Sequence, residues 1–163
     1  MAVSMLDGKR ILAVDDEPDV LTILKDEILE AAPKCTLGKA MTYEEAIEKL
    51  KSQPYDVVIL DIMGVRGFDL LDLAVKSNMK VVMLTAHALN PQALKRSFEM
   101  KARAYLPKEK LGEVVPFLED VLEDEYLPGW RKLMGKLKKF FDSKFESDWE
   151  KKTELPWREW GKS

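Results

Sequence analysis

The chain has 163 residues, of which 46% are hydrophobic and 34% are charged, and its formal net charge is −3. This length is sufficient for one well-buried domain with an appendage and is too short for two full domains. A single cysteine, Cys35, excludes an intramolecular disulfide. Residues 1–8 lack the pattern of a secretory signal, and no apolar run reaches the roughly 18 residues that a membrane helix requires. We therefore expect a soluble, cytoplasmic protein.

Short apolar segments alternate with segments of helical periodicity along the first 125 residues. The expected strands are residues 9–14, 35–40, 55–61, 80–85 and 104–107, and the expected helices begin near Pro18, Thr42, Phe68, Asn90 and Leu111. Strict alternation of this kind is typical of an α/β fold, a doubly wound parallel sheet with helices on both faces.

Polar side chains stand at the ends of four expected strands. The central strand ends on Asp61, the first runs into Asp15 and Asp16, the fourth ends at Thr85 and the fifth leads into Lys108. Since the carboxyl ends of parallel strands meet at one edge of a sheet, we expect these groups to converge. Carboxylates that merely cap the following helices are the competing interpretation. A converged set would suit a divalent cation and a phosphoryl group.

The order and spacing of these residues resemble the receiver domain of a two-component response regulator. The resemblance is carried by Val14–Pro18 (VDDEP), Asp61, Thr85-Ala86 and Tyr105–Lys108 (YLPK), and it extends over about residues 7–125. It implies the flavodoxin-like strand order 2-1-3-4-5. We accordingly expect a receiver domain over residues 1–125.

The resemblance also implies the phosphoacceptor and its metal ion. Asp61 would accept a phosphoryl group from a partner histidine kinase or phosphotransfer protein. Asp15, Asp16, Asp61 and the backbone carbonyl of Met63 would hold Mg²⁺, which prefers oxygen ligands. Such a protein is not an enzyme beyond its own phosphorylation and dephosphorylation.

Three further roles follow from the same resemblance. Lys108 would pair with the phosphate, and Thr85 would donate a hydrogen bond to it. Tyr105 would be the aromatic switch residue that moves together with Thr85.

Two departures from the family pattern stand near the expected site. The loop from Asp61 to Phe68 is about two residues shorter than usual and lacks a proline. Glu109 follows Lys108 where a proline is usual, so we expect a trans bond there, because a cis bond before another residue costs about 2.5–4 kcal/mol.

Residues 126–163 form a segment of different composition. They carry a net charge of +4, against −7 for residues 1–125, and 8 of the 14 aromatic residues. After a break at Leu127-Pro128-Gly129, apolar residues recur at spacings of three and four from Trp130 to Trp149, which predicts an amphipathic helix.

The burial of this apolar stripe has several alternatives. It could pack on the receiver or on a second copy of the tail, which would give a homodimer. It could instead dock in a partner's groove, on an anionic membrane or on nucleic acid. Membrane binding is not our preferred reading, and a segment of 38 residues is too short to predict a DNA-binding domain.

The leading functional hypothesis is a single-domain response regulator that signals through a phosphorylation-dependent contact with a downstream protein. One alternative is a transcription regulator that uses the basic tail on DNA. Another is a phosphatase of the haloacid dehalogenase type. Such a phosphatase needs a second acid two residues after its nucleophile, where this chain has Met63.

Overall fold

The computed structural model describes residues 4–153, and these form one five-stranded parallel sheet of order β2-β1-β3-β4-β5. The strands are β1 (Arg10–Val14), β2 (Thr36–Ala40), β3 (Val57–Asp61), β4 (Lys80–Thr85) and β5 (Ala104–Pro107). The helices are α1 (Pro18–Ala31), α2 (Tyr43–Ser52), α3 (Gly67–Lys76), α4 (Pro91–Glu99), the 3₁₀ helix η1 (Lys108–Glu113), α5 (Val114–Glu123), α6 (Tyr126–Lys144) and α7 (Trp149–Thr153). The predicted fold class and strand order are confirmed, while residues 154–163 of the predicted extension lie outside the described residues.

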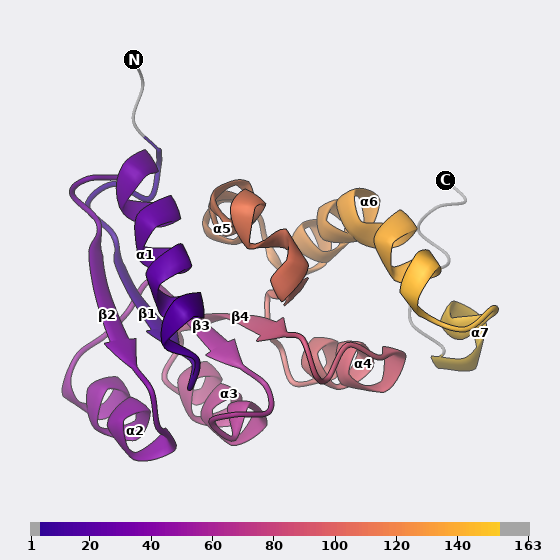
Figure 1. Cartoon of the computed structure of the whole chain (residues 1–163), viewed down its shortest axis with the longest axis horizontal. Helices are drawn as coiled ribbons and strands as arrows, with labels where there is room; N and C mark the ends of the chain where they lie inside the picture. The colour runs from indigo at the N-terminus through magenta and orange to yellow at the C-terminus, as the bar shows by residue number, and fades with distance from the viewer. Residues whose placement is uncertain (1–3, 154–163) are drawn as a thin grey trace.

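The sheet is covered by helices on both faces. Figure 1 shows α1 and α5 on one side of the sheet, and α2, α3 and α4 on the other. Every residue of the central strand β3 is buried, as expected for a strand enclosed between two helical layers. This burial makes the carboxyl end of β3, where Asp61 stands, a place shielded from bulk water.

Local sequence signals place the helix starts close to the strand ends. The Thr42 hydroxyl accepts a hydrogen bond from the Glu45 N–H (3.1 Å) at the start of α2, and the Asn90 side chain accepts one from the Ala93 N–H (2.8 Å) at the start of α4. Pro18 occupies a first-turn position of α1, where a missing N–H costs nothing. The loops that lead from each strand into the next helix therefore lie at the carboxyl edge of the sheet.

The helix predicted over residues 111–125 is divided in the structure. The chain forms η1 directly after β5 and begins α5 only at Val114. Pro116 lies in the first turn of α5, a position at which proline is tolerated and helps to fix the helix start. The prediction of a helix in this region is thus confirmed, but its predicted start at Leu111 is wrong, because the α-helix begins at Val114.

The tail contains two helices rather than one. The predicted break at residues 127–129 is wrong, because Pro128 lies in the first turn of α6, where proline is accommodated. The chain instead breaks at Asp124, which has extended backbone angles. The stripe is interrupted near its other end, where Phe145 is extended and Asp148 has a positive φ of 64° before α7 begins.

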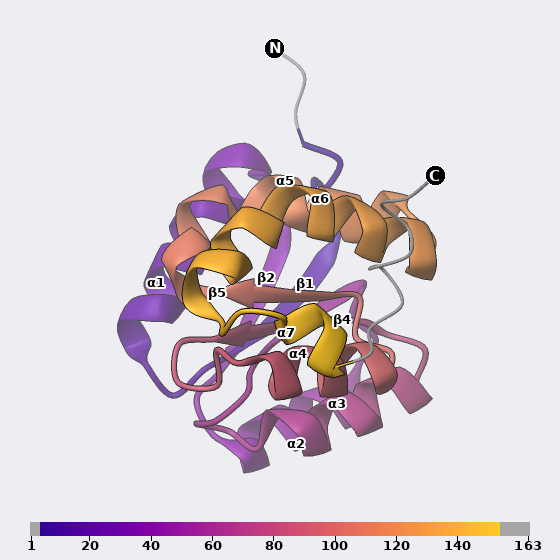
Figure 2. The ribbon, with the colours of Figure 1, turned by 90° about the vertical axis from the view of Figure 1, so that its right-hand side faces the viewer.

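The tail packs on the five-stranded fold along the β5 edge of the sheet. Figure 2 shows α6 running beside α5 and α7 lying in front of α4. The Trp130 indole N–H donates to the Ala102 carbonyl (2.8 Å), and the rings of Phe141 and Tyr105 have centroids 5.8 Å apart. Of the alternatives left open by the sequence, packing of the apolar stripe on the rest of the same chain is the one that the described residues show. The covered edge leaves fewer strand groups available for association with other chains.

Opposite charges accompany this contact. Lys132 pairs with Asp124 at 2.9 Å and Lys144 with Glu109 at 3.6 Å, so basic tail residues meet acidic residues of the preceding domain. Exposed ion pairs contribute about 0–1 kcal/mol each. Full burial of one large apolar side chain contributes about 1.5–3 kcal/mol. Apolar burial therefore dominates the docking, and the ion pairs favour its register.

Within residues 4–153, no helix has both the length and the apolar composition that a bilayer-spanning helix needs.

We expect Trp130→Ala to lower the free energy of unfolding of the full chain by about 3–5 kcal/mol, because this fully buried side chain would leave a cavity between α6 and the five-stranded fold. Trp130→Phe should cost about 1–3 kcal/mol, since the Ala102 carbonyl loses its donor. Urea unfolding followed by circular dichroism measures both. Lys139→Ala, on the exposed side of α6, is the control and should change stability by less than about 0.5 kcal/mol. A Trp130→Ala variant as stable as this control would contradict the docked arrangement.

Candidate functional site

Three carboxylates meet at the carboxyl edge of the sheet. Asp61 ends β3, and Asp15 and Asp16 follow β1, which pairs in parallel with β3 through Val14 and Leu60. One oxygen from each acid lies within 4.8 Å of the others. Asp15 is 0% exposed and Asp61 is 4% exposed, whereas Asp16 is open to solvent. The structure therefore brings these three acids together, as the sequence predicted.

Lys108 supplies the positive charge of this pocket. It follows β5 directly, and its ammonium lies 2.9 Å from Asp15 Oδ2, 2.7 Å from Glu17 Oε1 and 3.3 Å from Asp61 Oδ1. Burial alone would lower the pKa of Lys108, but the ion pairs with Glu17 and Asp15 outweigh burial and raise it above the ordinary value. The lysine is consequently charged and fixed between the acids.

The same pocket perturbs the acids in opposite directions. Burial raises the pKa of both Asp15 and Asp61, and the ion pairs with Lys108 offset this only in part. The hydrogen bond from Lys108 lowers the pKa of Glu17, which lies at the exposed rim. One lysine therefore does not fully compensate the buried negative charge.

The residues present fit a divalent cation. Buried Asp15 Oδ2 faces Lys108 but has no partner with hydrogen-bond geometry, so it retains capacity for a ligand. The donor set is oxygen only, which is the set that Mg²⁺ selects. Asp15, Asp16 and Asp61 are the side chains that would hold the ion.

Thr85 and Tyr105 stand beside the pocket rather than within the acid cluster. The buried Thr85 Oγ1 accepts a hydrogen bond from the Ala88 N–H at 2.8 Å. Tyr105 is completely buried, and its hydroxyl donates to the Ala88 carbonyl at 2.6 Å. Both predicted residues thus contact Ala88 in the loop between β4 and α4. Thr85 binds its N–H, and Tyr105 binds its carbonyl.

The shortened loop after Asp61 brings its backbone close to the acids. The Gly64 N–H donates to Asp61 Oδ2 at 3.0 Å. A Cβ on Gly64 would lie 2.2 Å from Asp16 Oδ1, and one on Gly67 would lie 2.3 Å from the Asp61 carbonyl oxygen. A side chain at position 67 would have to displace the backbone of Asp61 and Ile62, so only glycine fits there, whereas a side chain at position 64 would have to displace the exposed Asp16 carboxylate.

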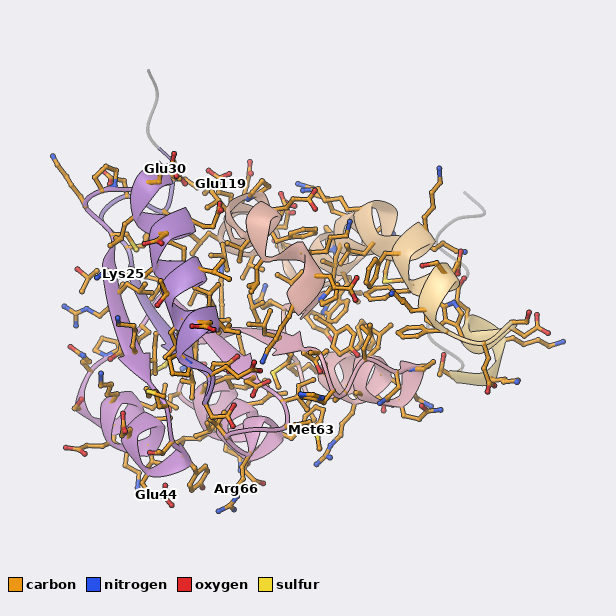
Figure 3. The ribbon with its side chains drawn as sticks, viewed as in Figure 1. Lys25, Glu30, Glu44, Met63, Arg66 and Glu119 are labelled. Carbon is orange, nitrogen blue, oxygen red and sulfur yellow. The ribbon has the colours of Figure 1, made fainter. Side chains whose placement is uncertain are left out.

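The two remaining predictions for this region have different outcomes. Met63, labelled in Figure 3, lies on the loop between β3 and α3 with its side chain exposed. The metal-binding role of its carbonyl stays a prediction. The bond between Lys108 and Glu109 is trans, as expected, because no described peptide bond is cis.

Sequence reasoning missed three residues of the site. Glu17 pairs with Lys108, and Gly64 and Gly67 allow the close approach of the loop. A signal was present for each of them. Glu17 follows the acid pair directly, and glycines in a shortened loop indicate restricted space.

Comparison with known proteins gives a consistent result. Residues 11–115 match the response regulator receiver domain family. The chain is 33% identical over 89 residues to chemotaxis protein CheY of Thermotoga maritima, which is 53% of this chain and 73% of that protein. It is 36% identical over 85 residues to two-component response regulator ARR18 of Arabidopsis thaliana, which is 50% of this chain but 13% of that longer regulator.

A solved structure extends the likeness to the fold. Response regulator protein TrrA from Thermotoga maritima, in complex with Mg²⁺ and beryllofluoride, is 33% identical, with a TM-score of 0.59. The match covers 70% of this chain and 99% of that one. The family match ends at residue 115, before α6 and α7 begin.

The raised pKa of Asp61 gives a prediction for stability. The folded state binds this proton more tightly than the unfolded state, so the contribution is favourable below the ordinary value of 3.8 and is lost as pH rises through the folded-state value. Asp61→Asn removes the buried charge and should raise the free energy of unfolding at neutral pH by more than the roughly 0.5 kcal/mol of an ordinary surface substitution. This gain should shrink as the pH falls and the parent carboxyl takes up its proton.

Urea unfolding of both proteins across this pH range measures the difference. Asp72→Asn, at an exposed acid of α3, is the matched control and should be neutral within about 0.5 kcal/mol. An Asp61→Asn variant that is less stable than the parent at every pH would contradict the account of the pocket.

Proposed function

The chain belongs to the response regulator receiver domain family, and we propose that Asp61 accepts a phosphoryl group from a partner histidine kinase or phosphotransfer protein. Receiver domains are phosphoacceptors and not classical enzymes. The observation that carries the proposal is the placement of Asp61 at the carboxyl end of the central strand, where the Lys108 ammonium lies 3.3 Å from Asp61 and 2.9 Å from Asp15.

In the proposed reaction, an Asp61 oxygen attacks the phosphorus of a phosphohistidine. The new P–O bond forms while the P–N bond breaks, and the released imidazole keeps the electron pair. The transferred group passes through a loose transition state whose charge lies on its outer oxygens. Lys108, 3.3 Å from Asp61, is placed to neutralise that charge. Transfer would draw the lysine from Glu17 toward the phosphoryl group.

The remaining residues would orient the group. Thr85 uses its oxygen to accept from Ala88, and its hydroxyl proton is available for a phosphoryl oxygen. The Gly64 N–H fixes one Asp61 oxygen and leaves the other for attack. A Mg²⁺ ion held by Asp15, Asp16, Asp61 and the Met63 carbonyl would offset the negative charge of acids and phosphate together.

The proposed output is a phosphorylation-dependent contact with a downstream protein, in the cytoplasm. The tail argues for a protein contact rather than for DNA binding. Lys132, Lys136 and Lys138 all form ion pairs with acidic residues of the chain, so much of the basic face is already engaged. We keep residues 1–125 as the proposed receiver and 126–163 as its extension.

We expect a small phosphodonor such as acetyl phosphate to label the full chain in the presence of Mg²⁺, as measured by the mass of the intact protein. Asp61→Asn should abolish the labelling, since it removes the attacking carboxylate, and chelation of Mg²⁺ should reduce it by about 10²-fold or more. Asp72→Asn should label like the parent. Equal labelling of Asp61→Asn and the parent would refute the proposal.

The phosphatase alternative is separated in the same samples. Sustained hydrolysis of a phosphate ester such as p-nitrophenyl phosphate, lost in Asp61→Asn, would favour that enzyme class. We expect no such turnover, because Met63 occupies the place of the required second acid.

A further inference from the structure

The Tyr105 hydroxyl ties β5 to the loop that follows Thr85. It donates to the Ala88 carbonyl at 2.6 Å and accepts from the Asn90 N–H at 3.1 Å. The ring is completely enclosed. The position of this one side chain therefore fixes the path of the loop between β4 and α4.

The same loop sets the Thr85 hydroxyl. The Ala88 N–H donates to Thr85 Oγ1 at 2.8 Å, so Ala88 is bonded to Thr85 through its N–H and to Tyr105 through its carbonyl. A shift of Tyr105 would move Ala88 and release Thr85 from its present orientation. The hydroxyl proton of Thr85 would then no longer point toward a phosphoryl group on Asp61.

The tail packs against this arrangement. Phe141 of α6 is 0% exposed, and its ring centroid lies 5.8 Å from that of Tyr105. The Phe145 ring stacks on the Phe141 ring with centroids 5.2 Å apart, and the Trp149 ring meets the Phe141 ring edge-on with centroids 6.2 Å apart. Asn90 borders a groove of about 300 Å³ together with Phe145 and Trp149. The tail consequently packs on Tyr105 and faces, across this groove, the loop that Tyr105 holds.

We propose that Phe141 is a positioning residue for the phosphoacceptor site. By packing on Tyr105 it keeps the tyrosine hydroxyl on Ala88 and Asn90, and so holds the Thr85 hydroxyl ready to donate to a phosphoryl oxygen on Asp61. This inference rests on the proposed function of Asp61. Linkage requires the converse, that a phosphoryl group on Asp61 strengthens the docking of the tail by the same factor.

The test is calorimetric titration of the full chain with beryllofluoride in the presence of Mg²⁺. Phe141→Ala should weaken beryllofluoride binding by about fivefold or more, the lower end of typical coupling between sites. Phe141→Met, which refills most of the space, should restore much of the affinity. Leu133→Ala is the matched control, since Leu133 is buried on α6 but lies beside Arg103 and Phe117, away from the aromatic cluster. It should change the affinity by less than about twofold.

A double-variant cycle separates positioning from general destabilisation. Tyr105→Phe keeps the ring and removes the hydroxyl bonds to Ala88 and Asn90. In that background Phe141→Ala should have no further effect on beryllofluoride affinity, because the route to Thr85 is already cut. A loss of the same factor in both backgrounds, or a loss no greater than that of Leu133→Ala, would overturn the inference.

The outcome also separates this inference from the proposed function. If the parent binds beryllofluoride and is phosphorylated on Asp61, but Phe141→Ala behaves like the control, only the positioning role of Phe141 fails. If the parent neither binds beryllofluoride nor accepts phosphate, the proposed function fails and the inference falls with it.

Discussion

The ion pairs of Lys108 are the interaction on which the site depends. Two buried carboxylates cannot remain charged at close range without a cation, because the desolvation of each costs several kcal/mol. Lys108 meets this requirement from the end of β5, at 2.9 Å from Asp15 and 3.3 Å from Asp61. Its single charge leaves the acid cluster net negative. A pocket of this kind favours a divalent cation, and in the proposed transfer its lysine would change partner as the phosphoryl group arrives.

Strand β5 connects this pocket with the tail. Lys108 follows its carboxyl end, and Tyr105 within it contacts the loop after Thr85 on one side and Phe141 of α6 on the other. The edge of the sheet that would otherwise be open is therefore covered by the chain's own helices (Figure 2). A partner that approaches this edge would meet α6 and α7 first.

The strand ends were readable from the sequence because apolar runs and their terminal polar residues are local features. That locality placed Asp15, Asp61, Thr85 and Lys108 at one edge before any contact was known. Contacts between distant segments were not readable in this way. The pairing of Lys108 with Glu17 spans 91 residues. The tail helices were predicted as one, because a periodic stripe does not reveal a single residue with positive φ such as Asp148.

The most direct test of the central claim is a crystal structure of the full chain with Mg²⁺ and beryllofluoride. The account predicts beryllium bonded to an Asp61 oxygen, the Lys108 ammonium on a fluoride, and the metal ion between Asp15, Asp16 and Asp61. Beryllofluoride absent from Asp61 at saturating concentration, with Lys108 still paired to the acids as in the present structure, would contradict it.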